Sequence, residues 1–192
     1  MRNITAFAGP ARVGKTTAAR ILQEELGGVC LSFAGPLKEA AVALTGLDMR
    51  MFTDQYSKLI PLEILGGKTP RKFMQLLGTE FVREMVNPNF WESRMADTIR
   101  QTGGRNIYID DVRFNDECRT IKQLGGIVIE LRRVTVPYES NHKSEMGLSD
   151  PNYVIHVPEL DDEYELKKFL LTTMSVMPEV STVKLREAIG QL

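Results

Sequence analysis

Short apolar runs alternate along this chain with longer stretches in which apolar residues recur every three or four positions. The first run, residues 4–8, is followed by a glycine-rich loop, and the stretch 17–26 then has helical spacing that ends at Gly27-Gly28. Similar short runs occur at 29–33, 106–111, 127–131 and 153–157. Strands that alternate with helices predict an α/β fold with a central parallel, doubly wound sheet.

The middle of the chain predicts helices rather than strands. A Gly-Pro pair at 35–36 begins a helical pattern that Gly46 ends, whereas residues 47–68 mix apolar and charged residues with Pro and Gly. We expect residues 47–68 to form a mobile insertion with little regular structure. Thr69-Pro70 then supplies an N-cap and a first helical residue, so a new helix is predicted to begin there.

Two helices after Thr69 carry polar residues in a definite pattern. In the first, Arg71 and Gln75 lie one turn apart and Arg83 falls on the same broad polar flank. The opposite, apolar side of this helix carries Phe73, Met74, Leu77, Phe81 and Val82. The second helix is predicted over 87–101, with Trp91, Met95 and Ile99 on one face. We expect residues 47–102 to form an acceptor-binding insertion in the sheet domain.

The most specific motif, Gly9-Pro-Ala-Arg-Val-Gly-Lys15-Thr16, lies between the first predicted strand and helix. Glycines let backbone N–H groups turn inward around a polyphosphate, and the helix N-terminus adds a positive dipole. Lys15 would reach the β- and γ-phosphates, and the Thr16 hydroxyl would ligate Mg²⁺. We predict a P-loop that binds ATP and Mg²⁺ through Gly9, Ala11, Arg12, Val13, Gly14, Lys15, Thr16 and Thr17. The expected fold is therefore the three-layer sandwich of P-loop NTPases.

Acidic residues follow a strand that should lie beside the loop strand. The run 106–111 ends in Asp110-Asp111, at the sheet edge where ligands bind in open α/β folds. A carboxylate there can hold Mg²⁺ directly or through water, or can simply cap the next turn. We favour Asp111 as the metal ligand, because Arg113 follows two residues later. Arg113 could neutralise a transferring phosphoryl group or hold an acceptor phosphate, and Glu117 could orient it.

Other basic and aromatic residues are candidates for acceptor and lid contacts. Arg71 and Arg83 could bind a monophosphate and Trp91 could stack on a base, although a solvated helix face and an ordinary core position compete with these roles. Arg132 precedes the polar residues 133–152. That segment could close as a lid and bring cations over the phosphates, or it could be an ordinary surface loop.

Several motifs together resemble those of the bacteriophage deoxynucleoside monophosphate kinases. They are the loop Gly9–Thr16, Thr69-Pro-Arg71 with Gln75, Gly78-Thr-Glu80 with Arg83, Phe90-Trp91, Asp111-Val-Arg-Phe-Asn-Asp-Glu117 and His142-Lys-Ser-Glu145. The resemblance implies transfer of the γ-phosphate of ATP to a deoxynucleoside 5′-monophosphate. It implies that Lys15 and Thr16 hold ATP and Mg²⁺, that Asp111, Arg113 and Glu117 belong to the active site, and that Arg71, Arg83 and Trp91 lie on the acceptor side.

The predicted site therefore has three parts. Its residues are Lys15, Asp111, Arg113 and Arg132 for catalysis, Thr16 and Asp111 for Mg²⁺, and Arg71, Gln75, Arg83, Trp91, Arg113 and Glu117 for the acceptor. A GTPase switch is disfavoured, because neither Asn-Lys-x-Asp nor Asp-x-x-Gly occurs in the chain. A P-loop kinase for another small phosphorylated metabolite or coenzyme precursor stays open, since arginines bind a phosphate whatever is attached to it.

Composition sets limits on this interpretation. A length of 192 residues suits one kinase domain, 1–192, with the insertion and with a lid at 133–152. The net charge of −1 gives no basic excess, which argues against a nucleic-acid partner. Cys30 and Cys118 have no metal-ligand spacing and are expected to be small buried residues in a reducing compartment.

The start of the chain and its hydrophobicity bear on where the protein acts. The chain begins directly with a predicted strand and without a signal-peptide pattern, and no apolar run approaches the roughly 18 residues of a membrane span. We expect a protein of the cytoplasm, or of the host cytoplasm if it is encoded by a phage. A monomer and a small oligomer such as a homodimer are both compatible with the sequence.

Overall fold

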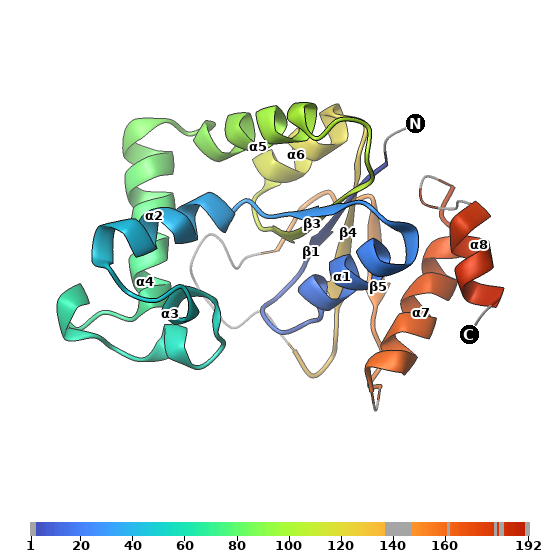
Figure 1. Ribbon diagram of the computed structural model, residues 1–192, viewed down its shortest axis with the longest axis horizontal. Coiled ribbons are helices and arrows are strands. Elements are labelled where there is room, and N and C mark those ends of the chain that lie inside the picture. The colour runs from blue at the N-terminus through green and yellow to red at the C-terminus, as the bar shows by residue number, and fades with distance from the viewer. Residues whose placement is uncertain (1–2, 137–146, 161, 179, 181–182, 191–192) are drawn as a thin grey trace. The chain divides into compact units, whose positions relative to one another are not determined.

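Helices and strands alternate through most of the chain in the computed structural model, which describes residues 3–136, 147–160, 162–178, 180 and 183–190 (Figure 1). In order, the elements are β1 (Ile4–Ala8), α1 (Lys15–Leu26), β2 (Val29–Leu31), α2 (Gly35–Thr45), α3 (Arg50–Thr53), the 3₁₀ turns η1 (Ser57–Leu59) and η2 (Glu63–Leu65), α4 (Pro70–Gln75), the π-helix η3 (Leu76–Val86), α5 (Phe90–Gln101), β3 (Ile107–Val112), α6 (Asn115–Gln123), β4 (Ile127–Arg132), β5 (Tyr153–His156), α7 (Glu163–Ser175) and α8 (Val183–Gly190). They form two compact units: a sheet unit, Met1–Leu31 with Ala96–Leu192, and a helical unit, Ser32–Met95.

The sheet unit is built on β1, which lies between β3 and β4. The strand order is β2-β3-β1-β4-β5, and every neighbouring pair is parallel, as the sequence predicted. All of β1 and all but the last residue of β4 are buried, because parallel strands are covered by helices on both faces. The carboxyl ends of β1, β3 and β4 therefore meet at one edge of the sheet, where the glycine-rich loop begins.

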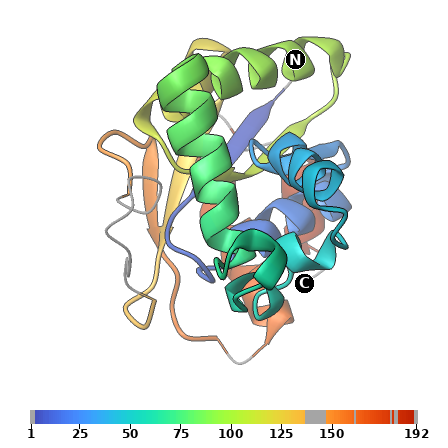
Figure 2. The same cartoon turned by 90° about the vertical axis from the view of Figure 1, so that its left-hand side faces the viewer.

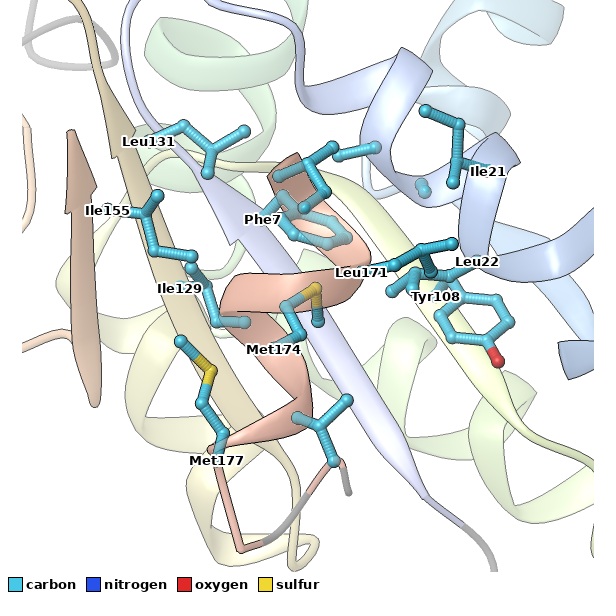
Figure 3. Close-up of a cluster of buried hydrophobic side chains, with 14 of the residues drawn as sticks. Phe7, Ile21, Leu22, Tyr108, Ile129, Leu131, Ile155, Leu171, Met174 and Met177 are labelled. Atoms are coloured by element: carbon cyan, nitrogen blue, oxygen red, sulfur yellow. The ribbon is translucent and has the colours of Figure 1, made fainter. Parts of the chain in front are cut away.

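One face of the sheet is covered by α1, α7 and α8. Buried side chains on this face include Phe7, Ile21, Leu22, Tyr108, Ile129, Leu131, Ile155, Leu171, Met174 and Met177 (Figure 3). Full burial of each such aliphatic or aromatic side chain stabilises the fold by about 1.5–3 kcal/mol. The chain crosses β1 in the opposite direction between β3 and β4, so the right-handed crossover places α6 on the other face. The resulting layers are helix, sheet and helix.

The helical unit has more regular structure than the sequence predicted. The expectation of little structure over residues 47–68 is wrong, because this stretch contains α3, η1, η2 and a bridge between Leu62 and Lys68. The predicted start of the next helix is confirmed: the Thr69 hydroxyl accepts a hydrogen bond from the backbone N–H of Lys72 at 3.1 Å. Pro70 is the first residue of α4.

The helix that begins at Pro70 changes its winding after Gln75. Figure 2 shows α4 continuing into η3, the green rod, and the backbone N–H of Asn87 bonds to the carbonyl of Val82 at 2.9 Å, five residues earlier. A π-helix has wider turns than an α-helix, so faces calculated from α-helical spacing drift along it. Phe81, predicted on the apolar side, is accordingly 50% exposed.

Two further expectations concern the cysteines and the membrane. Cys118 is buried as predicted, and desolvation raises the pKa of its thiol above the ordinary value. Cys30 is exposed on β2, so its predicted burial is wrong; β2 is an edge strand and leaves this side chain accessible. Across the described parts of the chain, no helix is both long enough and apolar enough to span a bilayer.

Candidate functional site

The residues from Gly9 to Thr16 form a tight loop between β1 and α1. Gly9 and Gly14 have φ values of 130° and 106°, in the region that favours glycine, and Arg12 also has a positive φ of 68°. A Cβ at Gly9 would lie 2.3 Å from the carbonyl oxygen of Leu131 in β4. Position 9 therefore requires glycine both for its backbone conformation and for its close approach to β4.

Lys15 is the first residue of α1 and folds back over the loop. Its Nζ donates hydrogen bonds to the carbonyl oxygens of Gly9 at 2.9 Å and Pro10 at 2.7 Å. The helix N-terminus directly behind the loop presents backbone N–H groups and a partial positive charge. An ammonium group, a helix N-terminus and glycine-shaped backbone together fit a polyphosphate.

Thr16 connects the loop to the end of β3. Its Oγ1 donates a hydrogen bond to Oδ2 of Asp110 at 2.7 Å. A hydroxyl and a carboxylate are the hard oxygen donors that Mg²⁺ prefers, so this pair fits the metal predicted for the loop. The negative charge of Asp110 also reaches β2: partial desolvation raises the pKa of Cys30, and Asp110 raises it further.

The acid found against Thr16 is thus Asp110, whereas the sequence argument favoured Asp111. Successive residues of a strand point to opposite faces, so Asp110 shares the side of Tyr108, which packs in the core beneath α1. The register between β1 and β3 also shifts between Ala6 and Ala8, opposite these two acids. The sequence argument used the closeness of Asp111 to Arg113 along the chain, which does not show which acid faces the loop. Because every second residue of a strand points to the same side, the buried Tyr108 could have indicated Asp110.

Glu117 holds the turn that leads from β3 into α6. Its buried carboxylate accepts the backbone N–H groups of Arg113 at 2.8 Å and Phe114 at 3.2 Å. Phe114 occupies the N-cap position, and Glu117 provides the acidic half of a capping box. The side chain of Asn115, the first residue of α6, accepts the backbone N–H and the hydroxyl of Ser149. Glu117 thereby fixes the main chain at Arg113, which is half-buried.

Arg132 is the last residue of β4, on the strand beside β1, and its guanidinium pairs with the buried carboxylate of Glu130. Sequence reasoning missed Glu130, although a lone acid two residues before an arginine in an apolar strand was a usable signal. Half of the predicted lid, 133–152, lies outside the described residues, namely 137–146 with the His142-Lys-Ser-Glu145 motif. Of its described start, Arg133 and Val136 form an isolated bridge.

Four residues predicted for the acceptor belong to the helical unit. Arg71 and Gln75 are half-buried and one turn apart on α4, as the sequence predicted. Trp91 is half-buried, and its Nε1 donates a hydrogen bond to the carbonyl oxygen of Gly78 at 2.9 Å. Its ring packs edge-on against that of Phe90, with the ring centroids 4.9 Å apart. Its predicted stacking on a base stays a prediction.

Arg83 lies in a different environment from the polar flank that the sequence predicted. It is only 8% exposed, and its Nη1 donates to Glu92 of α5, itself 5% exposed. The π-winding of η3 accounts for the change, because it turns position 83 away from the face calculated with α-helical spacing. Glu92 was not among the predicted residues, and no local pattern in the sequence pairs it with Arg83.

Comparison with known proteins identifies the family. Residues 63–163 match the family model for deoxynucleotide monophosphate kinases. A protein of Acanthamoeba polyphaga mimivirus, named as a deoxynucleotide monophosphate kinase, is 35% identical over 147 residues, which cover 70% of this chain and 76% of that protein. The chain belongs to the deoxynucleotide monophosphate kinase family. This confirms the resemblance drawn from the sequence motifs.

Other matches of this family member are more distant. The deoxynucleoside-5′-monophosphate kinase of Escherichia phage T5 is 30% identical over 95 residues, which cover 46% of this chain and 38% of that enzyme. Among solved structures, the dephospho-CoA kinase of Campylobacter jejuni has a TM-score of 0.46 at 12% identity, covering 91% of this chain and 96% of that one. Shikimate kinase of Acinetobacter baumannii has a TM-score of 0.46 at 18% identity, and the match covers 93% of this chain and 96% of that one.

Proposed function

We propose that this chain transfers the γ-phosphate of ATP to a deoxynucleoside 5′-monophosphate and releases the diphosphate. The observation that carries the proposal is the phosphate loop itself, in which Lys15 covers the loop backbone and Thr16 bonds to Asp110 at 2.7 Å. Loop, ammonium and acid are the parts that P-loop kinases use to hold a nucleoside triphosphate. Membership of the deoxynucleotide monophosphate kinase family supports the choice of acceptor.

On the donor side, the backbone N–H groups of the loop and Lys15 hold the phosphates. Thr16 and Asp110 would hold Mg²⁺, with Asp111 as the neighbouring acid predicted from sequence. Mg²⁺ held by these residues would neutralise charge on the phosphate oxygens of ATP. Gly9 and Gly14 keep the loop backbone in the shape that turns its N–H groups toward the phosphates.

On the acceptor side, we assign Arg71 and Gln75 to the monophosphate and Trp91 to the base. Arg113, whose main chain Glu117 fixes, would neutralise the phosphoryl group in transfer, as would Arg132. The reaction needs no side-chain nucleophile, since the acceptor phosphate is already an anion. Catalysis then consists of positioning two substrates and stabilising charge in the transition state.

A coupled assay of ADP release over a panel of acceptors tests the proposal. The panel contains the deoxynucleoside and ribonucleoside monophosphates, together with phosphorylated sugars and a dephosphorylated coenzyme precursor. We expect ADP release that depends on a deoxynucleoside monophosphate and on Mg²⁺. Release that depends only on a sugar phosphate or the coenzyme precursor would assign the chain to a different P-loop kinase activity.

A further inference from the structure

Glu130 is a charged residue in the middle of an otherwise apolar strand. β4 reads Ile-Val-Ile-Glu-Leu-Arg, lies between β1 and β5, and Glu130 has no exposed surface. A carboxylate without access to water is costly unless it is paired and hydrogen-bonded. An aliphatic side chain would fill the same position without this cost. The acid at this position therefore points to a requirement other than packing.

Glu130 forms an ion pair with Arg132, which lies on the same face of the strand. Nε of Arg132 donates to Oε1 of Glu130 and Nη2 donates to Oε2, both at 3.0 Å. This is the two-bond fork that fixes a guanidinium in one plane and one direction. The Arg132 side chain remains 46% exposed, while the Glu130 side chain is fully buried. Glu130 is thus a rigid support and Arg132 is the group presented toward solvent.

The pair lies next to the phosphate loop. Glu130 is the register partner of Ala8, the last residue of β1, and the carbonyl of Leu131 is the group that a Cβ at Gly9 would meet at 2.3 Å. The backbone of Arg132 is held as well, because its carbonyl accepts the N–H of Val157 at 2.8 Å. The fork engages Nε and Nη2 of Arg132, so it holds the guanidinium in one orientation at the end of β4.

We propose that Glu130 is a positioning residue for phosphoryl transfer, which it serves by fixing the guanidinium of Arg132 beside the phosphate loop. This inference rests on the proposed kinase function. Glu130 itself touches no substrate; it sets the direction of the Arg132 guanidinium, whose positive charge would act on the phosphoryl group. A preoriented guanidinium stabilises transition-state charge without having to be ordered during the reaction. The contribution of Glu130 therefore falls on kcat and leaves both KM values close to those of the unmodified chain.

Glu130→Leu and Glu130→Gln separate positioning from folding. Glu130→Leu replaces the buried charge with an apolar side chain, and the Arg132 side chain is already 46% exposed, so the melting temperature should stay level or rise. We expect kcat to fall about tenfold or more in both variants, with the KM for ATP and for the acceptor changing less than about threefold. Glu25→Gln is the matched control, because Glu25 pairs with Lys167 at 2.6 Å near the C-terminal end of α1, the end away from the loop. Its kcat should equal that of the unmodified chain.

A double-mutant cycle with Arg132→Lys completes the test. Lysine keeps the charge but cannot form the fork, so Arg132→Lys should also lower kcat. Adding Glu130→Gln to Arg132→Lys should lower kcat only a little further, because the two residues act as one unit. An unchanged kcat in Glu130→Leu, or fully additive losses in the cycle, would overturn the positioning role alone. Absence of transfer by the unmodified chain to every acceptor would instead overturn the kinase function.

Discussion

Lys15 donates to two carbonyl oxygens of its own loop, and a bound triphosphate would offer it stronger, anionic partners. Lys15→Met removes the charge while keeping most of the apolar stem. We expect phosphoryl transfer to fall about 10³-fold or more, because the ammonium stabilises charge in the transition state. Turnover and circular dichroism measured on the same preparation check this. A folded Lys15→Met protein with normal turnover would contradict the assignment of the loop.

Asp110 and Asp111 differ in their relation to Thr16, and this difference can be measured. If Asp110 helps to hold Mg²⁺ together with Thr16, Asp110→Asn should raise the Mg²⁺ concentration for half-maximal activity about 10- to 100-fold. Asp111→Asn is the matched control and should shift it much less. A Mg²⁺ titration of the two variants decides between them. The opposite order of effects would return the metal to Asp111, as the sequence alone suggested.

Single residues of the site were predictable where the backbone motif dictates their role, and less so where the fold does. Gly9, Lys15 and Thr16 follow from their spacing, because a phosphate loop requires those residue types in that order. Asp110 and Glu130 depend on which side of a strand faces the loop, and on a register shift opposite Asp110. Such details arise when strands pair, so spacing along the chain defines them poorly.

The contact between the phosphate loop and β4 predicts the effect of a small change at Gly9. In Gly9→Ala, the new Cβ would meet the Leu131 carbonyl at 2.3 Å, so the loop has to move and ATP affinity should be lost. Gly27→Ala is the control: Gly27 also has a positive φ, of 68°, but nothing lies within 4 Å of its Cβ position. Both variants should lose about 1–3 kcal/mol of stability from backbone strain. Calorimetric titration with ATP should show the affinity loss only for Gly9→Ala; equal affinities would contradict the steric argument.

The long helix formed by α4 and η3 separates two arginines that the sequence placed together. Arg71→Ala should weaken binding of a deoxynucleoside monophosphate about 10- to 150-fold, the loss expected for one charge-assisted hydrogen bond, with little change in melting temperature. Arg83→Ala should instead destabilise the fold by about 3–5 kcal/mol, because it leaves Glu92 buried without its ion-pair partner. Thermal unfolding and calorimetric titration of both variants check this. Weaker acceptor binding with unchanged stability in Arg83→Ala would restore the role predicted from sequence.

The same helix marks the limit of prediction at the level of elements. The strands, α1, and the N-cap at Thr69 follow from apolar runs, glycines and capping residues, which act locally. The π-winding of Leu76–Val86 does not, since its sequence fits an α-helix equally well. The π-wound segment instead makes contacts with α5: Arg83 binds Glu92, and the carbonyl of Gly78 accepts a hydrogen bond from Trp91. The face that each residue occupies therefore had to come from the structure.

At the scale of the whole molecule, the proposed activity needs the sheet unit for the donor and residues of the helical unit for the acceptor. The most direct test follows the phosphoryl group itself. ATP labelled with ¹⁸O in its γ-phosphoryl group is mixed with a deoxynucleoside 5′-monophosphate, Mg²⁺ and the protein. The masses of the products are then measured by mass spectrometry. The account predicts that the label appears in the deoxynucleoside diphosphate and that Lys15→Met abolishes its appearance. Label found only in inorganic phosphate, with the monophosphate unchanged, would contradict it.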